Sequence, residues 1–279
     1  MRRDDQRQAV KNIPLEQLKP FKNHPFQVRD DEEFRRLVES IEIHGVIHPA
    51  VARQIGEDCY ELISGHRRKA ACEVLGYSEM PVLVRSMTDD EAVVNMVDAN
   101  LQRETILPSE RAFAYKMKLV AMSHQGRKGF TSAQLGRKLE TADIVGQESG
   151  DSRNQVRRFI RLTNLVPELL DMVDEKKIAF NPAVELSYLD ESQQRDFFEA
   201  MNDTQNAPSL SQAQRLKKLA QEGHFSYDVA FAVMGEEKKD ELDKVVIKND
   251  TLRKYFPRSY TPKQMEDTII KLLEQWQRK

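Results

Sequence analysis

The stretch from Tyr60 to Ala71, with the sequence YELISGHRRKAA, constrains the fold more than any other part of the chain. Its first four residues alternate in character and include aromatic and β-branched types, which predicts a short strand. Ser64 and Gly65 break that strand, and the residues from Arg67 to Leu75 then favour a helix with an alanine-rich buried side. The sequence therefore predicts a strand, a tight glycine turn and a helix in direct succession.

Two arginines, Arg67 and Arg68, stand in the first turn of this predicted helix. The backbone N–H groups and the dipole at a helix N-terminus favour anions and disfavour cations. Two cations at this place are explained if a phosphate is bound there, or if both side chains are solvated surface groups beside a turn glycine. The local pattern leaves both interpretations open.

Three short boxes in the chain, in this order, resemble the boxes of the ParB family of partition proteins. The family's Gly-x-x-Gln-Pro box is similar to Gly45–Pro49, its Gly-Glu-Arg-Arg-x-Arg-Ala box to Gly65–Ala71, and its Glu-Asn-x-Gln-Arg box to Ala99–Arg103. The resemblance covers roughly residues 12 to 190 of the 279 and fades after that. It implies a CTP-binding switch domain joined to a DNA-binding domain.

The resemblance also implies which residues surround the nucleotide. They are Gly45, His48, Pro49, Ser64, Gly65, His66, Arg67, Arg68, Asn100, Gln102 and Arg103. Three positions depart from the family pattern, because His66 replaces a Glu, Ala70 replaces the third Arg, and Ala99 replaces a Glu. The methyl group of Ala99 cannot coordinate the Mg²⁺ that accompanies CTP in the family. We therefore expect CTP to bind and hydrolysis to be slow or absent, so that the chain is at most a weak CTPase.

A basic middle segment predicts the DNA-binding module. The whole chain has a net charge of −2, but Leu101 to Leu165 contains 12 Lys and Arg against 6 Asp and Glu. Two capping boxes in this segment, Thr131–Gln134 and Ser152–Gln155, each open a short predicted helix. The second helix carries the basic and amide side chains typical of a recognition helix in a helix-turn-helix. The predicted DNA-contacting residues are Thr131, Gln134, Ser152, Arg153, Asn154, Gln155, Arg157, Arg158 and Arg161.

The spacing between these two capped helices is unusual. An ordinary helix-turn-helix has a turn of roughly three or four residues, whereas Glu140–Asp151, with two glycines, intervenes here. We interpret this segment as an inserted loop. A solvated basic helix is the alternative to DNA binding, but the paired caps and the order of the family boxes favour DNA binding.

These patterns divide the chain into four parts. Residues 1–11 are expected to form a flexible basic tail, 12–103 an α+β ParB/sulfiredoxin-like nucleotide-binding domain, 104–202 a mostly helical helix-turn-helix domain, and 203–279 a small helical C-terminal region. In the first domain, strands are predicted near Ile13, at His48–Arg53 and at Met80–Arg85, and helices at Asp31–Ile43 and Asp89–Gln102.

The C-terminal region ends in a capped amphipathic helix. Thr261–Gln264 forms a capping box with proline at the first helical position. One stripe of the following helix carries Met265, Ile269, Leu272, Leu273 and Trp276. This stripe either packs inside the monomer or forms a dimer interface, and the dimer agrees with the resemblance.

Several other kinds of site are disfavoured. Sulfiredoxin chemistry needs a cysteine directly before His-Arg, where this chain has Gly65, and Cys72 lies well into the helix. His44 and His48 have the spacing of a metal pair on a helix, but the glycine and proline that follow them break that helix. No apolar run approaches the roughly 20 residues of a membrane span, and the first residues lack the apolar core of a signal peptide.

The sequence thus predicts a ParB-type, sequence-specific DNA-binding protein for chromosome, plasmid or mobile-element segregation. The resemblance implies a homodimer that binds a palindromic centromere-like site in double-stranded DNA, closes as a CTP-gated clamp and works with a ParA-type ATPase, with the basic tail as a contact. A cytoplasmic, nucleoid- or plasmid-associated location without a membrane partner is expected. A helix-turn-helix transcriptional repressor without a segregation role is the alternative. A nuclease on a ParB-like fold is a further alternative, for which the sequence supplies no clear general base with a metal cluster.

Overall fold

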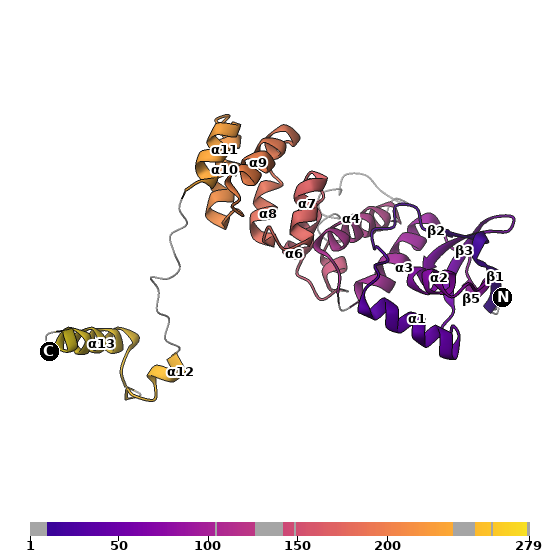
Figure 1. Cartoon of the computed structure of the whole chain (residues 1–279), viewed down its shortest axis with the longest axis horizontal. Helices are drawn as coiled ribbons and strands as arrows, with labels where there is room; N and C mark the ends of the chain where they lie inside the picture. Colours follow the sequence, from indigo (N-terminus) through magenta and orange to yellow (C-terminus); the bar gives the residue numbers. More distant parts are fainter. Residues whose placement is uncertain are drawn as a thin grey trace. The chain divides into compact units, whose positions relative to one another are not determined.

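The computed structural model describes residues 10–103, 105–125, 142–147, 149–236, 249–257 and 259–277. The chain forms two compact units, residues 1–235 and residues 236–279. Figure 1 shows the strands and helices of both units. The expected fold class, an α+β domain followed by a mostly helical part, is confirmed.

One mixed sheet of five strands forms the N-terminal part, in the order β1-β5-β3-β4-β2. Central β3 pairs antiparallel with β4 and parallel with β5, while β1 and β2 form the edges. The strands predicted in this part are confirmed, and β2 is an addition that the sequence did not predict. The strands are β1 (Val10–Pro14), β2 (Leu18–Pro20), β3 (Ala50–Gly56), β4 (Cys59–Ser64) and β5 (Glu79–Val84).

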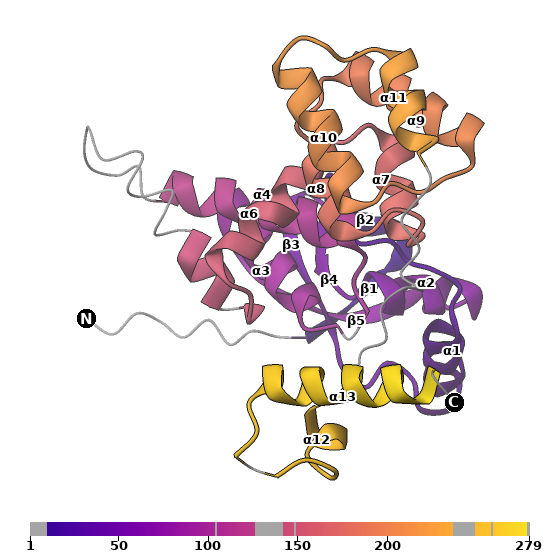
Figure 2. The same ribbon diagram turned by 90° about the vertical axis from the view of Figure 1, so that its left-hand side faces the viewer.

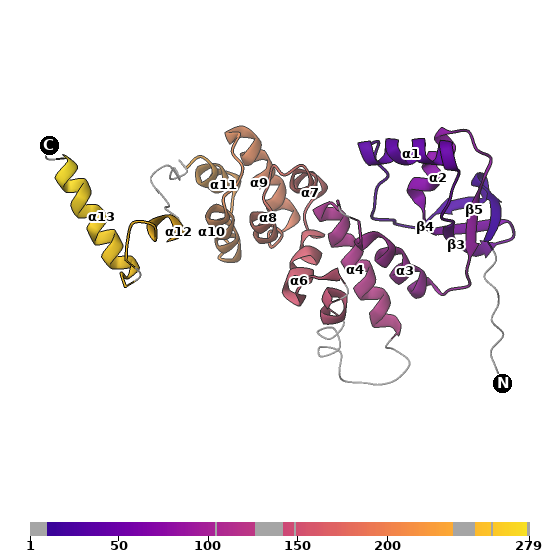
Figure 3. The same cartoon turned by 90° about the horizontal axis from the view of Figure 1, so that it is seen from below.

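Helices cover both faces of this sheet, because successive side chains of a strand point to opposite faces. Leu62 of β4 belongs to a core that includes Phe34 of α1 and Ala71 of α2. Its neighbour Ile63 belongs to a second core that includes Met96 of α3. Figure 3 shows α1 and α2 together on one side of the strands. These helices are α1 (Glu32–His44), α2 (His66–Val74) and α3 (Asp89–Leu101).

The rest of the first unit is helical and has its own core, in which Leu162, Leu169, Leu186 and Phe197 are fully buried. Helix α4 packs against α3 on one side and against α6 and α7 on the other, so it connects the sheet domain to the helical core. The helices here are α4 (Pro108–Gln125), α6 (Arg153–Leu162), α7 (Pro167–Asp174), α8 (Phe180–Leu186) and α9 (Glu191–Thr204).

Residues 142–147 are helical, so the inserted loop predicted over Glu140–Asp151 is wrong for this segment. Val145 is fully buried and joins the helical core. Gly146 closes the turn that follows, since a Cβ atom there would lie 2.5 Å from the carbonyl oxygen of Asp151. The segment is therefore a packed turn of helix that positions the start of α6.

Helices α10 (Leu210–Gln221) and α11 (Tyr227–Met234) complete the first unit. α10 packs on α8 and α11 packs on α9 (Figure 2). Ser209 caps α10: its Oγ accepts from Gln212 N at 3.2 Å and its N–H donates to Gln212 Oε1 at 2.9 Å. The domain boundary at residue 203 stays a prediction.

The second unit contains α12 (Asn249–Leu252) and α13 (Pro262–Gln277). The capping box at the start of α13 is confirmed, because Thr261 and Gln264 exchange backbone-to-side-chain hydrogen bonds of 2.9 and 3.3 Å. Of the predicted stripe, Met265 is buried, whereas Leu273 and Trp276 are 57% and 76% exposed. Most of this stripe therefore has no partner within the described part of its unit. No helix in the described ranges is both long enough and apolar enough to span a bilayer.

Candidate functional site

The turn between β4 and α2 has a conformation that only glycine adopts easily. Gly65 has φ +106°, and a Cβ atom on it would lie 2.8 Å from the Cβ of Ala50. α2 begins at His66, one residue before the predicted start, and its first i-to-i+4 bond runs from Lys69 N to Gly65 O at 2.9 Å. The N–H groups of the first helical turn therefore lie directly after the carboxyl end of β4, where an anion is favoured.

Arg68 joins the first two boxes. Its guanidinium donates to the carbonyl oxygen of Pro49 at 2.9 Å and also to that of His48. Gly45, at the start of the first box, has φ +68° and closes α1 by donating from its N–H to Ile41 O at 2.8 Å. Burial lowers the pKa of Arg68, and the two carbonyls stabilise the charge that remains. Arg68 is thus mainly a brace between the boxes.

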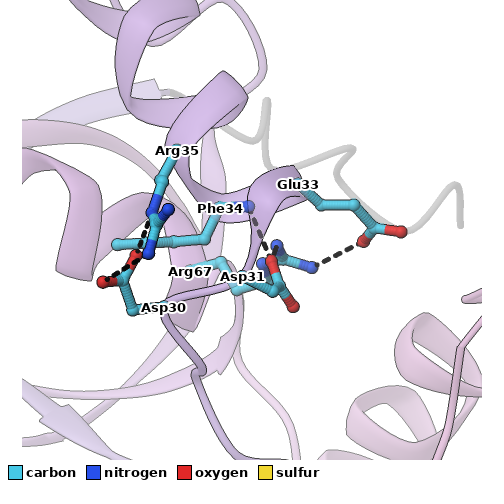
Figure 4. A network of polar contacts seen from close by, with 6 residues as sticks. All are labelled: Asp30, Asp31, Glu33, Phe34, Arg35 and Arg67. Carbon is cyan, nitrogen blue, oxygen red and sulfur yellow. Dashed lines mark hydrogen bonds and ion pairs between the residues drawn. The ribbon is translucent and has the colours of Figure 1, made fainter.

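Arg67 points instead to the start of α1 (Figure 4). One terminal nitrogen donates to Asp31 Oδ1 at 2.8 Å and the other to Glu33 Oε2 at 3.1 Å. The Nε of Arg67 is buried and has no acceptor within the described part of the chain. The guanidinium is therefore held by two carboxylates through its outer nitrogens and is unsatisfied at its inner one.

His66 stacks on His24, with ring centroids 3.9 Å apart. The N–H of Phe21 donates to His66 Nε2 at 3.4 Å, so this nitrogen carries the lone pair. Burial lowers the pKa of His66 to about 3, and the neighbouring charges of His24, Arg103 and Lys69 act in the same direction. His66 is therefore neutral at pH 7, unlike the glutamate of the resembling family.

The third box ends α3. Asn100 is buried and donates from its amide to Met96 O at 2.7 Å, so it stabilises the last turn of the helix. Arg103 lies over the ring of Phe26, with its guanidinium carbon 5.6 Å from the ring centroid. Burial and the charge of Arg67 lower the pKa of Arg103. Glu110, Glu33 and Asp31 act on this pKa in the opposite direction, but among the described residues no side chain or carbonyl accepts a hydrogen bond from the Arg103 guanidinium.

Arg67 and Arg103 line one small cleft of about 40 Å³. Glu110 at the start of α4 also lines it, and accepts from Arg29 at 2.8 Å and from the N–H of Gln27 at 3.0 Å. A larger cavity of about 720 Å³ lies between residues 23–25, α3 and α4, but its lining includes none of the predicted nucleotide residues. We therefore place the candidate anion site at the small cleft.

A second candidate site is the outer surface of α6. Ser152 caps this helix by accepting from Gln155 N at 3.2 Å, and Val156, Phe159 and Leu162 are buried. The outer face carries Arg153, Asn154 and Arg157, which are exposed. Thr131 and Gln134, predicted to contact DNA, lie outside the described residues.

The three arginines in the middle of α6 differ in their surroundings. Arg158 lies 5.1 Å over the ring of Phe180 and donates to Asn181 Oδ1 at 2.5 Å. Arg161 lies 3.9 Å over the ring of Tyr188 and donates to the carbonyl oxygen of Ser187 at 3.0 Å. Arg157 is exposed, and no acceptor in the described ranges holds it. Arg157 is thus the most available of the three for an external ligand.

Residues 1–101 match the ParB N-terminal domain. These residues form a ParB N-terminal domain. The first two boxes, Gly45–Pro49 and Gly65–Ala71, lie within it.

Similar ParB-family relatives are known by the name nucleoid occlusion protein. That of Lysinibacillus sphaericus is 31% identical over 172 residues, which cover 62% of this chain and 52% of the relative. That of Bacillus cytotoxicus is 30% identical over 171 residues, which cover 61% and 53%. The chain thus spans about half the length of these curated relatives.

Solved structures of ParB proteins are also similar. The C-terminally truncated chromosome-partitioning protein ParB from Caulobacter crescentus, complexed to the centromeric parS site, is 19% identical, with coverage of 80% of this chain and 98% of that chain and a TM-score of 0.43. The same protein complexed with CTP-gamma-S is 23% identical, with coverage of 64% and 92% and a TM-score of 0.32. These overall superpositions are loose, and the ParB N-terminal domain is shown by the match over residues 1–101.

The ParB sequence boxes did not reveal every residue around the cleft. The sequence missed His24, Phe26, Arg29, Asp31, Glu33 and Glu110, which come from the segment before α1, from α1 and from the start of α4. Asp31 gave a local signal as the N-cap of α1. The others carry no local pattern, because they meet the boxes through contacts distant in sequence.

The stacked histidines of this ParB domain predict a dependence of stability on pH. Below the ordinary pKa of 6.5 the unfolded chain takes up a proton on His66, whereas the folded chain does so only near about 3. The unfolded state therefore binds more protons in this window, and stability falls as the pH is lowered, by up to about 1.4 kcal/mol per pH unit for one group. Urea unfolding of His66→Gln between pH 6.5 and 4 should show a smaller slope than the wild type. Identical slopes would contradict the burial of a neutral His66.

Proposed function

We propose that this ParB-family chain is a DNA-binding partition protein whose hold on DNA is gated by CTP bound at the β4–α2 turn. The observation that carries this proposal is the convergence of the three boxes. Arg68 of the second box donates to carbonyls of the first, and Arg103 of the third lines the same cleft as Arg67. A ParA-type ATPase would move the loaded DNA, with residues 1–11 as its contact.

The residues around the turn fit a triphosphate. The N–H groups at the start of α2 can donate to phosphate oxygens, and the guanidiniums of Arg67 and Arg103 can form charge-assisted hydrogen bonds. Arg103 has no acceptor in the described part of the chain, and burial, followed by the charge of Arg67, lowers its pKa. An anion between them would relieve this repulsion. When bound, CTP supplies phosphate oxygens that can accept hydrogen bonds from the guanidinium of Arg103.

The donor set at the third box does not fit Mg²⁺ well. Ala99 is exposed and offers only a methyl group where the family has a carboxylate. Asn100 is buried and its amide nitrogen donates within α3, so this side chain offers only its Oδ1. The carboxylates of Asp31 and Glu33 are bonded to Arg67. We therefore propose that CTP binds and that its hydrolysis is slow or absent.

A continuous set of contacts can transmit nucleotide binding to the DNA site. Arg103 directly follows α3, and α3 packs on α4, where Lys118 donates to Asp98. On its other side α4 packs on α6, and Lys116 donates to Thr163 Oγ1 at 3.1 Å, at the end of α6. A displacement of α3 by the nucleotide would thus change the position of α4 relative to α6.

The test is whether CTP changes the hold on DNA. A bound sequence can be selected from random double-stranded DNA with the full chain and then measured by interferometry, on fragments with one free end and with both ends blocked. We expect CTP to increase retention on the blocked fragment only, because a clamp slides off an open end. Equal retention with and without CTP would reject gating and favour the plain repressor.

The exposed stripe of α13 predicts a dimer. Leu272, Leu273 and Trp276 are 58%, 57% and 76% exposed, and an apolar stripe of this kind is stabilised by a second copy. Deleting residues 261–279 should give a monomer that binds a two-fold DNA site weakly, because the linked second contact is lost. Sedimentation equilibrium measures the mass, and Trp276→Lys is the matched point variant. A truncated chain that stays a dimer would place the interface elsewhere.

Nucleoid occlusion is a second candidate function, favoured by the name of the relatives that align over 171 and 172 residues. The two functions require different distributions of binding sites, because segregation loads one region whereas occlusion acts across the nucleoid. Immunoprecipitation of the chain with its DNA in the native cell distinguishes them. One cluster of sites supports partition, and sites dispersed over the chromosome support occlusion.

A further inference from the structure

The side chain of Arg67 is already occupied in the present structure. Both terminal nitrogens donate to carboxylates at the start of α1, to Asp31 at 2.8 Å and to Glu33 at 3.1 Å (Figure 4). The Arg67 side chain is only 20% exposed, which lowers the screening of these pairs by water. Glu33 and Asp31 thus stand where phosphate oxygens would bind Arg67.

The three arginines around the turn are held to different degrees. Arg68 donates to backbone carbonyls, so it contributes to the shape of the site. Arg103 has no acceptor among the described residues, although burial and Arg67 lower its pKa. Arg67 is bound to carboxylates. The guanidinium of Arg103 is therefore available to a ligand at once. That of Arg67 becomes available only if Asp31 and Glu33 release it.

The size of the cleft also indicates that Arg67 must leave its carboxylates before a triphosphate can bind. The space between Arg67, Arg103 and the surrounding carboxylates is about 40 Å³, enough for a few water molecules and too small for a triphosphate. Asp31, Glu33 and Glu110 line it, and their negative charges repel phosphate. The cleft can accept a triphosphate only when Arg67 leaves the two carboxylates of α1.

We propose that Asp31 and Glu33 form an autoinhibitory contact, in which the start of α1 competes with the ligand's phosphates for Arg67. This inference rests on the proposed nucleotide site and adds its regulation. Asp31 Oδ1 also accepts from Phe34 N at 2.7 Å as the N-cap of α1. Phosphate binding to Arg67 leaves that cap in place but breaks the ion pairs that join the start of α1 to α2. The ligand's arrival is thereby transmitted to α1 as well as to α3.

The direct test is the affinity of Glu33→Gln, which keeps the shape of the side chain and removes its charge. The matched control is Glu32→Gln, because Glu32 precedes Glu33 in the same helical turn and pairs with Arg36 instead of Arg67. Isothermal titration with CTP and with inorganic tripolyphosphate gives the affinity of each full-length variant. We expect Glu33→Gln to bind both ligands about two- to fivefold more tightly than the wild type, and Glu32→Gln to bind like the wild type.

Equal affinities of the wild type and Glu33→Gln would overturn the competition. An equal gain in both variants would also overturn it, since net charge alone would then explain the result. These outcomes leave the proposed nucleotide site intact. Absence of binding of CTP and tripolyphosphate to every variant would overturn the nucleotide site and the competition together.

A second measurement tests the contact through stability. A double-mutant cycle of Arg67→Ala and Glu33→Gln, followed by urea unfolding, reports the coupling between the two side chains. We expect a favourable coupling without ligand and its loss at saturating tripolyphosphate, because Arg67 then binds phosphate. A coupling that persists unchanged at saturation would contradict the exchange of partners.

Discussion

The Arg157→Ala variant is expected to bind its DNA site about 5- to 150-fold more weakly, if Arg157 makes the bidentate guanine contact worth about 1–3 kcal/mol. Arg157 is exposed on the outer face of α6, and nothing in the described ranges accepts a hydrogen bond from it. Arg158 and Arg161 are instead bonded to Asn181 and to the carbonyl of Ser187. Among alanine variants of these three arginines, Arg157→Ala should therefore lose the most DNA affinity.

Fluorescence anisotropy over a series of salt concentrations measures this effect. Loss of a base contact lowers the discrimination between specific and non-specific DNA. Loss of a phosphate contact lowers both affinities alike and reduces the salt slope by about one. Arg161→Ala is the control on the same helix. We expect it to lower the free energy of unfolding by about 1–2 kcal/mol, because the cation–π contact with Tyr188 and one hydrogen bond to Ser187 O are lost. Unchanged affinity in Arg157→Ala would reject α6 as the recognition helix.

The second large effect is expected at Arg103. A hydrogen bond to a charged group contributes about 1.5–3 kcal/mol, so Arg103→Ala should weaken CTP binding about 10- to 100-fold. The structure supports a role of Arg103 in CTP binding. Its guanidinium lacks an acceptor in the described part of the chain and lines the cleft together with Arg67. We expect Arg103→Ala to fold like the wild type, because the Arg103 side chain packs on the ring of Phe26 and forms no hydrogen bond in the described part of the chain.

Equilibrium dialysis with labelled CTP gives the affinity. The control is Arg36→Ala, an exposed arginine of α1 that pairs with Glu32 outside the cleft, for which we expect wild-type binding. Equal losses in the two variants would indicate an effect of net charge. Wild-type binding by Arg103→Ala would remove the third box from the nucleotide site.

Local patterns in the sequence predicted much of the fold. The β4–α2 turn was predictable because Gly65 interrupts a strand and a helix follows, and the observed φ of +106° requires a glycine there. The start of α6 was predictable because Ser152 caps it. The short strand β2 was not predictable, since it has three residues that include Pro20 and pairs in parallel with a strand remote in the sequence.

The parts of the candidate site that could not be predicted depend on long-range contacts. Asp31 and Glu33 reach Arg67 across more than thirty residues of sequence, and His24 meets His66 across a similar separation. The prediction of a loop before α6 was wrong for a related reason, because burial of Val145 in the helical core stabilises a helix there. In each case tertiary packing decided the outcome.

The most direct measurement is titration of the full chain with CTP in a calorimeter, followed by an assay of phosphate release from the same samples with and without the selected DNA site. We expect saturable heat at about one CTP per chain, with phosphate release that stays near the rate in buffer because Ala99 offers no carboxylate. A folded chain that shows no saturable heat with CTP at any concentration would contradict the account.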